Sequence, residues 1–199
     1  EDILRSIAEE KGANASEEVG EAAFYGPKVD FMAKDSLGRE WQTGTIQLDF
    51  QQPKSFKLHY IDNQGKEVQP VTLHRAIYGS FERFLGILIE HYAGAFPLWL
   101  APIQVALLPI ADRHMEFAKK VAKQLQAVGI RAEADVRSER LQAKIRDATL
   151  QKVPFMGIIG DKEVADEAIS VRMRDGRDLG TLKVSPFLQK LQQTIDKKI

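Results

Sequence analysis

The stretch His74–Phe84, which reads HRAIYGSFERF, is where the chain changes from a strand pattern to a helix pattern. Val71–Leu73 alternates before it as a strand does, and apolar residues recur after it at the three- and four-residue spacing of an amphipathic helix with one buried face. Gly79 lies at the turn, and Ser80 stands at the predicted N-cap, where its hydroxyl oxygen can accept a free backbone N–H. These residues predict a strand–turn–helix unit.

Arg83 is the unusual residue in the first turn of this helix. A capping box would place Glu or Gln there, and a cation at this end opposes the helix dipole. A bound anion would remove both difficulties, because helix N-termini and arginine side chains both bind phosphate. From the residues alone, the simpler interpretation is that Arg83 is solvated, or that it pairs with Glu82 or with a distant carboxylate.

Composition narrows the kind of protein. The 199 residues, 44% of them hydrophobic, suffice for one good core or two small ones, and the zero net charge means that an RNA contact would need a local patch. The absence of cysteine excludes disulfides and thiol catalysis and favours the cytosol. The most apolar run, 95–110, is broken by prolines, so no membrane span is expected. Because the chain starts at Glu1 and not at methionine, we expect it to begin part-way through a larger protein.

The first ninety or so residues predict an antiparallel sheet, which the helix after Gly79 is expected to close. An antiparallel sheet can leave one face open, so this sheet can serve as a substrate platform. The expected elements are a helix over 2–11, strands over 29–33 and 40–50 joined by the turn 35–38, and a second hairpin that pairs 56–61 with 68–73 around the turn 62–65.

Proline-rich 96–102 marks a boundary, beyond which strands alternate with helices. This alternation predicts a small α/β domain with a largely parallel sheet. The expected elements are strands over 103–108, 131–136 and 155–159, helices over 115–128 and 141–150, a hairpin of 168–174 with 180–184, and a last helix capped by Ser185.

Two runs carry a resemblance to a known family. His74–Phe84, followed by Ala95-Phe96-Pro97-x-Trp99-Leu100-Ala101-Pro102-x-Gln104-Val105, resembles the third signature motif of threonyl-tRNA synthetases and their passage into the anticodon-binding domain. The similarity continues in both directions across nearly the whole chain. It implies an α/β (α+β) fold class, with 1–98 as the C-terminal portion of a class II catalytic domain and 99–199 as an anticodon-binding domain.

The resemblance also implies site residues in the first half. Arg83 matches the arginine that binds ATP in the family. Arg83 and Lys28 are the two predicted catalytic residues. Alternation agrees in part, since Thr45 and Gln47 point to one face of their strand. From the sequence alone, solvent-exposed strand positions are the simpler explanation of these residues. The predicted ATP- and substrate-binding residues are Tyr25, Lys28, Gln42, Thr45, Gln47, Ser80 and Arg83. Glu21 and Asp49 receive no acid–base role, because adenylation depends on positioning and charge stabilisation.

His74 matches one of three protein ligands of a zinc ion that the threonine substrate also coordinates. A metal that requires a hydroxyl ligand rejects valine, which an apolar pocket cannot do well. In the family the other two ligands, a cysteine and a histidine, precede the part that corresponds to Glu1, so this chain alone is expected to bind zinc poorly. From the residues alone, a hydrogen-bonded structural histidine is the alternative. The implied cofactors are Zn²⁺, and ATP with Mg²⁺ as a substrate.

In the second half, Ser138, Arg146, Glu163 and Arg172 match anticodon-contacting positions of the family. Arginine and glutamate can hydrogen-bond to base edges in unstacked RNA loops. Ser138 is a departure, because the family commonly has asparagine there and a hydroxyl offers fewer contacts. Further cations nearby are Arg137, Arg140, Lys144 and Lys152. An ordinary solvated helix face is the alternative explanation of these charges.

The leading hypothesis is therefore ATP-dependent ligation of threonine to its tRNA through a threonyl-adenylate. The expected partners are tRNA(Thr), threonine, ATP and a second copy of the catalytic domain, in the cytoplasm or an organellar matrix. Without the first and second motifs, the chain by itself is expected to be inactive. The alternatives are a non-catalytic tRNA-binding module or truncated homologue, and a synthetase for proline or glycine, against which His74 argues.

Overall fold

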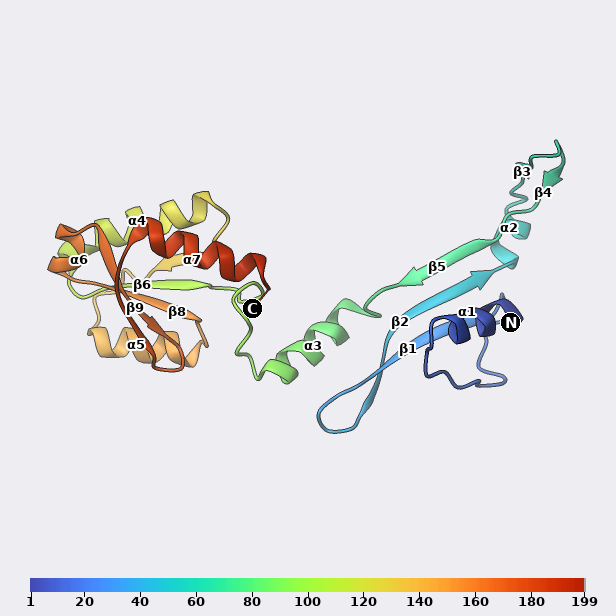
Figure 1. Ribbon diagram of the computed structural model, residues 1–199, viewed down its shortest axis with the longest axis horizontal. Coiled ribbons are helices and arrows are strands. Elements are labelled where there is room, and N and C mark those ends of the chain that lie inside the picture. Colours follow the sequence, from blue (N-terminus) through green and yellow to red (C-terminus); the bar gives the residue numbers. More distant parts are fainter. Residues whose placement is uncertain (199) are drawn as a thin grey trace. The chain divides into compact units, whose positions relative to one another are not determined.

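The computed structural model describes residues 1–198 and divides the chain into two compact units, Glu1–His91 and Tyr92–Ile199. Figure 1 shows helices and strands in both, with an antiparallel sheet in the first unit and a larger mixed sheet in the second. The predicted α/β (α+β) class is therefore confirmed. The functional division at 98/99 stays a prediction.

The first unit is built on a three-stranded antiparallel sheet in the order β1–β2–β5 (Figure 1). β1 (Lys28–Lys34) and β2 (Glu40–Asp49) form the predicted hairpin, and Asp35 Oδ1 accepts two backbone N–H groups of its turn, each at 2.9 Å. β5 (Thr72–Ala76) pairs with the other edge of β2. This arrangement makes β2 the central strand.

The predicted second hairpin is wrong in its extent. Only β3 (Tyr60–Ile61) and β4 (Glu67–Val68) pair around the turn, and each is two residues long. The residues that follow pair with β2 instead, because a long central strand offers β5 a continuous ladder, whereas an isolated two-stranded ribbon is marginal in water. Between β2 and β3 lies the short helix α2 (Gln51–Ser55).

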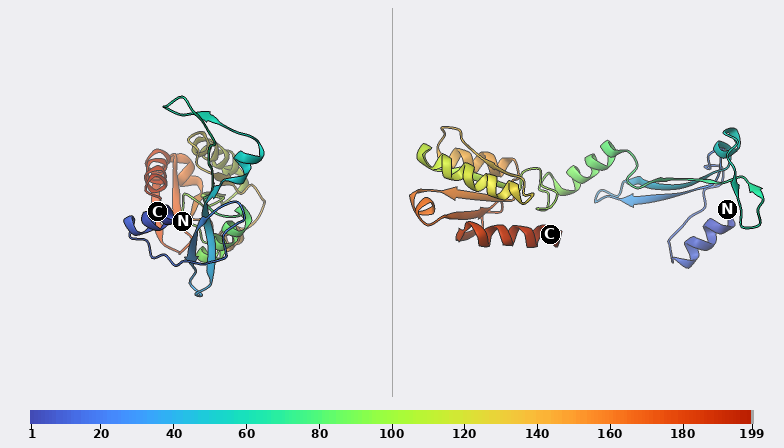
Figure 2. Two further views of the ribbon diagram at one scale, coloured as in Figure 1. Left: turned by 90° about the vertical axis from the view of Figure 1, so that its right-hand side faces the viewer. Right: turned by 90° about the horizontal axis from the view of Figure 1, so that it is seen from above.

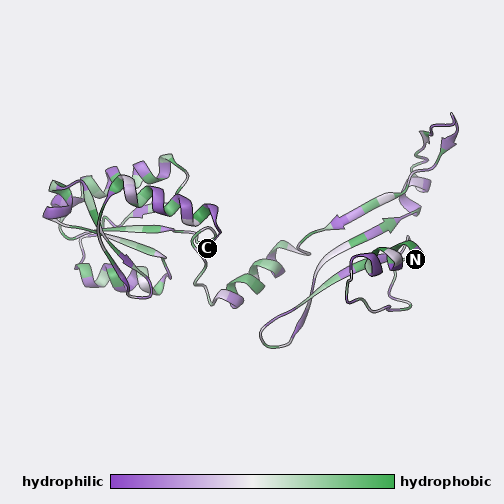
Figure 3. Ribbon diagram, viewed as in Figure 1, coloured by the Kyte–Doolittle hydropathy of each residue, from purple (hydrophilic) through white to green (hydrophobic). Residues whose placement is uncertain are grey.

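Two helices of the first unit have no buried face within residues 1–198. No residue of α1 (Asp2–Glu10) or α3 (Phe81–Tyr92) is buried. α1 projects to one side of the sheet in Figure 2, and α3 continues beyond the end of β5 (Figure 1). The expectation that α3 has a buried face and closes the sheet is therefore not met within residues 1–198. Figure 3 shows that α3 consists largely of apolar residues, and Phe81, Leu85 and Ile89 among them are exposed, with Phe81 at 76%.

The second unit contains a five-stranded sheet in the order β10–β9–β8–β6–β7. β6, β7 and β8 run parallel, and β9 and β10 add an antiparallel hairpin at one edge. The predicted small α/β domain is thus confirmed. The strand bounds are Val105–Pro109 for β6, Ala132–Ala134 for β7, Phe155–Ile159 for β8, Ala168–Met173 for β9 and Asp178–Lys183 for β10.

Helices cover both faces of this sheet. The helices are η1 (Asp112–His114), α4 (Met115–Ala127), α5 (Leu141–Leu150), α6 (Asp161–Ala165) and α7 (Val184–Asp196). α7 starts one residue before Ser185 and has no side-chain cap, so the predicted serine cap is wrong. None of the helices within residues 1–198 combines the length and the apolar character needed to span a bilayer.

Two apolar layers hold this second unit together. α4 and α7 pack on one face, where Leu107, Leu125 and Phe187 are fully buried. α5 packs on the opposite face against Leu108 and Met156, and Figure 1 shows it on the other side of the sheet from α4 and α7. Burial of large apolar side chains on both faces is the main stabilising term of this unit.

The proline-rich segment 96–102 is attached to the second unit. Leu98 and Ala101 are buried there. The buried amide of Gln104 donates to the Leu98 carbonyl and accepts the backbone N–H of Arg131, both at 2.8 Å. Arg131 in turn donates through Nε to the Ala101 carbonyl at 2.9 Å. These bonds anchor the segment to the first parallel strands.

Candidate functional site

Three adjacent strands of the first unit carry polar side chains on one face. The register places Lys28 opposite Gln47 and Gln47 opposite His74, and Asp30 opposite Thr45 in the next row. Residues two apart on a strand share a face, so both rows lie on the same side of the sheet. We call this set the polar face, and its members are Tyr25, Lys28, Asp30, Gln42, Thr45, Gln47, Asp49 and His74.

Asp30 is the centre of one half of the polar face. Its carboxylate accepts hydrogen bonds from Lys28 Nζ at 2.6 Å, from Gln42 Nε2 at 2.7 Å and from the Thr45 hydroxyl. Partial burial acts to raise the pKa of Asp30, but these donors outweigh it and hold the pKa below its usual range. The same hydrogen bond to Asp30 raises the pKa of Lys28, so the pair is charged at neutral pH.

Asp49 is the centre of the other half. Its side chain is 8% exposed, Oδ1 accepts two backbone N–H groups at the start of α2, and Oδ2 lies 3.0 Å from His74 Nε2. The backbone N–H of Gln52, followed by His74, holds the pKa of the Asp49 carboxyl below its usual range. Tyr25 packs edge-on against the His74 ring, and its hydroxyl donates to Gln47 Oε1 at 2.9 Å.

Gln42 reaches the polar face through a β-bulge. Simple alternation from Thr45 would send Gln42 to the opposite side. In the structure Met32 pairs with Gln42, whereas the residue before Met32 pairs with Gly44, so Thr43 is an extra residue in β2. A bulge of this kind reverses the alternation beyond it. The structure therefore gathers Tyr25, Lys28, Gln42, Thr45, Gln47 and His74, all named from the sequence, on one face.

The turn after β5 presents the two remaining predicted residues. Gly79 has φ +67°, in the left-handed region that glycine adopts readily. Ser80 Oγ accepts the backbone N–H of Arg83 at 3.2 Å, which confirms the predicted cap. The Arg83 side chain is exposed and has no hydrogen bond or ion pair with any other residue in 1–198, so the alternative pair with Glu82 is not formed.

Asp30 is not among the site residues predicted from the sequence, and Asp49 has no predicted role. Asp30 stands two residues after Lys28 on a strand, a spacing that puts both on one face and could have identified the pair. Asp49 could not be linked to His74 from spacing, because the two are 25 residues apart and meet only through strand pairing. Both aspartates hold the predicted residues in place.

The four predicted anticodon residues lie on two adjoining parts of the second unit. Ser138 follows β7 and Glu163 follows β8, and the carboxyl ends of parallel strands meet at one edge of a sheet. Arg146 is exposed on α5, and Arg172 pairs across strands with Met156, on the sheet face that α5 covers. Glu163 Oε2 also accepts the backbone N–H at the start of α6 at 2.9 Å.

Two of the further cations are structural. Lys144 is 2% exposed and donates to the carbonyls of Pro109 and Asp135, each at 3.1 Å, so it is not available to RNA as the sequence suggested. Arg137 is paired with Asp135 at 2.7 Å and with Asp147 at 3.0 Å. Both side chains fix the segment that leads from β7 into α5.

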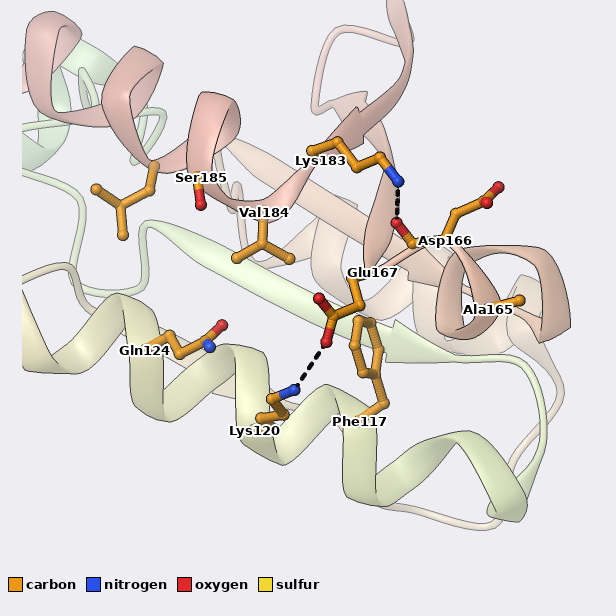
Figure 4. Close-up of a pocket in the computed structure, with 10 residues that line it drawn as sticks. Phe117, Lys120, Gln124, Ala165, Asp166, Glu167, Lys183, Val184 and Ser185 are labelled. Carbon is orange, nitrogen blue, oxygen red and sulfur yellow. Dashed lines mark hydrogen bonds and ion pairs between the residues drawn. The ribbon is translucent and has the colours of Figure 1, made fainter.

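A cleft of about 610 Å³ lies on the face that carries α4 and α7 (Figure 4). Within it, Lys120 pairs with Glu167 at 3.1 Å, and Lys183 donates to the Asp166 carbonyl. None of the predicted site residues lines this cleft. It is therefore separate from both candidate sites.

Comparison with known families also divides the chain into two segments. Residues 2–92 match the tRNA synthetase class II core domain (G, H, P, S and T), and residues 104–194 match the anticodon binding domain. The chain thus joins a class II aminoacyl-tRNA synthetase core segment to an anticodon-binding domain. Over nearly its whole length it is a homologue of threonine–tRNA ligases, as its relatives show.

Among these relatives, the threonine–tRNA ligase of Desulforamulus reducens is 50% identical over 98% of this chain and 31% of its own length, and that of Thermus thermophilus is 52% identical over 94% and 28%. The chain therefore spans about a third of the length of the curated relatives it matches. A crystal structure described as the RNA binding domain of threonyl-tRNA synthetase from Cryptosporidium parvum superposes with a TM-score of 0.89 at 36% identity, covering 97% of this chain and 49% of that one. A putative threonyl-tRNA synthetase from Aeropyrum pernix superposes at 0.70, with 32% identity over 99% of this chain and 48% of that one.

Proposed function

We propose that this chain is the C-terminal portion of a threonine–tRNA ligase, in which the first unit binds ATP and threonine and the second binds the anticodon of tRNA(Thr). The observation that carries the proposal is the polar face, where five residues that match the family's substrate positions lie beside the histidine that matches its zinc ligand, each with a hydrogen bond to another member of that face. In this proposal residues 1–98 act as the catalytic portion and 99–199 as the anticodon-binding domain.

The chemistry of the first unit fits adenylation. Arg83 offers a guanidinium that pairs with no other residue in 1–198, at a helix N-terminus where phosphate is favoured, and Ser80 lies beside it. Lys28 adds a second cation, and Tyr25, Gln42, Thr45 and Gln47 offer neutral donors and acceptors. ATP would enter with Mg²⁺, and catalysis would rest on positioning and charge stabilisation, so no protein base is required.

Among residues 1–198, His74 would fit a zinc ion as a single ligand. Asp49 holds His74 Nε2 and leaves Nδ1 without a hydrogen bond to any residue in 1–198, which is the arrangement of a metal-binding histidine oriented by a carboxylate. No three His, Asp or Glu side chains among those residues come together as a metal site. His74 would therefore supply one ligand and other parts of the enzyme the rest. When bound, zinc would distinguish threonine from valine by coordinating the hydroxyl.

The second unit supplies the RNA contacts in this proposal. Arg146, Glu163 and Arg172 would hydrogen-bond to anticodon bases, with Ser138 at the margin. Dimerisation through the catalytic unit is proposed because Phe81, Leu85 and other apolar residues of that unit are exposed in the described chain. We propose the cytoplasm or an organellar matrix as the location.

The test is amino-acid-dependent ATP–pyrophosphate exchange by the full-length protein that carries this chain. We expect exchange with threonine and little with valine, proline or glycine. Exchange with proline or glycine instead would refute the threonine assignment. Absence of exchange with every amino acid, together with binding of tRNA(Thr), would favour the alternative of a non-catalytic tRNA-binding module.

A further inference from the structure

We infer that Asp30 is a positioning residue for adenylation, through which Lys28, Gln42 and Thr45 are held in the orientation that receives the substrates. This inference rests on the proposed function, because it assigns Asp30 a role toward residues that bind substrate there. Neither the sequence motifs nor the comparisons single out Asp30.

The geometry gives Asp30 three donors from two strands. Lys28 stands on the same strand two residues away, whereas Gln42 and Thr45 come from β2. The Asp30 side chain is 24% exposed and that of Lys28 27%, so both are partly buried, and the carboxylate lies among its three donors. A carboxylate accepts several hydrogen bonds and donates none, so it can satisfy all three donors at once.

This arrangement decides which groups remain for a substrate. The Gln42 amide donates to Asp30 at 2.7 Å and to Thr45 Oγ1 at 3.2 Å, so its carbonyl oxygen is directed away as an acceptor. The Thr45 hydroxyl donates its one O–H to Asp30 and has no other proton to donate to a substrate. Lys28 keeps two further N–H groups for an anion such as a phosphate or carboxylate. The face therefore offers acceptors beside one cation, which suits the ammonium and hydroxyl groups of the substrates and their anionic groups.

An amide at position 30 would disturb this arrangement without changing its size. Asn has one acceptor oxygen in place of two, and its NH2 group would face either the Lys28 ammonium or the donors of Gln42 and Thr45, because these bond to different oxygens of Asp30. Because an unsatisfied or mispaired polar group in such a network is unfavourable, we expect kcat/KM for threonine-dependent exchange to fall about tenfold or more in Asp30→Asn, mainly through KM.

The experiment compares Asp30→Asn with Asp35→Asn in the full-length protein. Asp35 is a carboxylate of the same hairpin, 12% exposed, which accepts from Trp41 Nε1 at 2.9 Å and from Arg39 but lies outside the polar face. We expect Asp35→Asn to lower the melting temperature and leave KM unchanged, and Asp30→Asn to raise KM. Lys28→Met combined with Asp30→Asn should cost less than the sum of the single effects, because the two residues act together.

Three results would overturn the inference: a wild-type KM in Asp30→Asn, an equal rise of KM in Asp35→Asn, or full additivity with Lys28→Met. If Asp30→Asn does not accumulate as folded protein, Thr45→Val removes one of the three donors and should raise KM by a smaller factor; an unchanged KM there overturns the inference too. Wild-type protein that performs no threonine-dependent exchange would refute the proposed function itself, and the role of Asp30 with it.

Discussion

A guanidinium that has no partner among residues 1–198, at the third position of a helix, is available to an anion. Arg83 is in this position. Its backbone N–H already donates to Ser80 Oγ, so the side chain is the part of Arg83 that is left for a substrate phosphate. The planar fork of arginine suits both phosphate binding and stacking against a ring. Arg83 is therefore the residue of the proposed site that is best suited to bind ATP.

Replacing Arg83 by alanine should remove stabilisation of the charge that develops during adenylation. We expect ATP–pyrophosphate exchange by the full-length protein to fall by about 10² or more, roughly 3 kcal/mol. Arg75→Ala is the matched control, because Arg75 is an exposed arginine of β5 next to His74 in sequence, on the opposite face of the sheet. Near wild-type exchange in Arg83→Ala would refute the assigned role.

His74 can be tested through metal content as well as activity. We expect His74→Ala to lose bound zinc and to lower the preference for threonine over valine about a hundredfold, since an apolar pocket discriminates these isosteres poorly. His59→Ala serves as control, because His59 is exposed near β3 and away from the polar face. Metal analysis of purified full-length protein gives the first readout and exchange with each amino acid the second; retained zinc in His74→Ala would disprove the ligand role.

At the scale of elements, the strands and helix termini determine which side chains can meet. Pairing of β2 with β5 brings Asp49 to His74, and the bulge in β2 brings Gln42 to Asp30. In the second unit, β9 carries Arg172 on the same sheet face as α5, and parallel strands bring Ser138 and Glu163 to one edge. At this scale, the proposed sites depend on the register in which the strands pair.

Arg172 on β9 provides a test of the RNA-binding surface. Arg172→Ala should weaken binding of the tRNA(Thr) anticodon stem-loop by about 1–3 kcal/mol, or tenfold to a hundredfold, if the side chain reads a base edge. Arg177→Ala is the control, because Arg177 is held in the neighbouring turn by Asp175 at 2.7 Å. Equal losses in the two variants, measured at one salt concentration, would indicate only a general charge effect.

The segment from β7 to α5 predicts a dependence of stability on pH. Hydrogen bonding by Arg137 holds the pKa of Asp135 below its usual range, and the Asp135 side chain is only 15% exposed. A carboxyl whose folded pKa is lowered contributes stability above its unfolded pKa, about 3.9, and loses that contribution as the pH falls toward the folded value. Urea unfolding of Asp135→Asn should show a loss of about 1–3 kcal/mol at pH 7 and a smaller loss at pH 3. An equal loss at both values would exclude this linkage.

At the scale of the whole molecule, burial is divided unequally between the units. Every buried residue of the described apolar core, from Leu98 to Leu191, belongs to the second unit. In the first unit the buried residues are Gly44, Asp49 and Pro53, while Phe31, Leu73 and Phe81 are at least half exposed. A sheet with so little buried apolar area gains too little to offset the entropy of ordering it.

This difference predicts that the two units behave differently when separated. A fragment 92–199 should unfold in urea in a single cooperative transition, because both faces of its sheet are covered. A fragment 1–91 should give no cooperative transition and should bind a dye for exposed apolar surface. Circular dichroism and fluorescence measure both, and a cooperative transition in fragment 1–91 would show that its apolar surface needs no further partner.

Sequence alone determined the elements whose signals are local. Periodicity predicted α1, α5 and β8 within a residue or two, and the turn at Asp35 and the cap at Ser80 follow from the chemistry of those residues. The motif resemblance identified six of the residues on the polar face. Such features depend on neighbours along the chain, so the sequence contains the information directly.

Tertiary structure decided the contacts between residues far apart in the chain. Only strand pairing joins Asp49 to His74, only the bulge at Thr43 turns Gln42 toward Asp30, and only packing reveals that Lys144 is buried. The physical reason is that a register shift of one residue reverses the face of every later side chain, and local propensity does not select the register. The sequence therefore named most of the site, whereas the fold decided which of its residues touch.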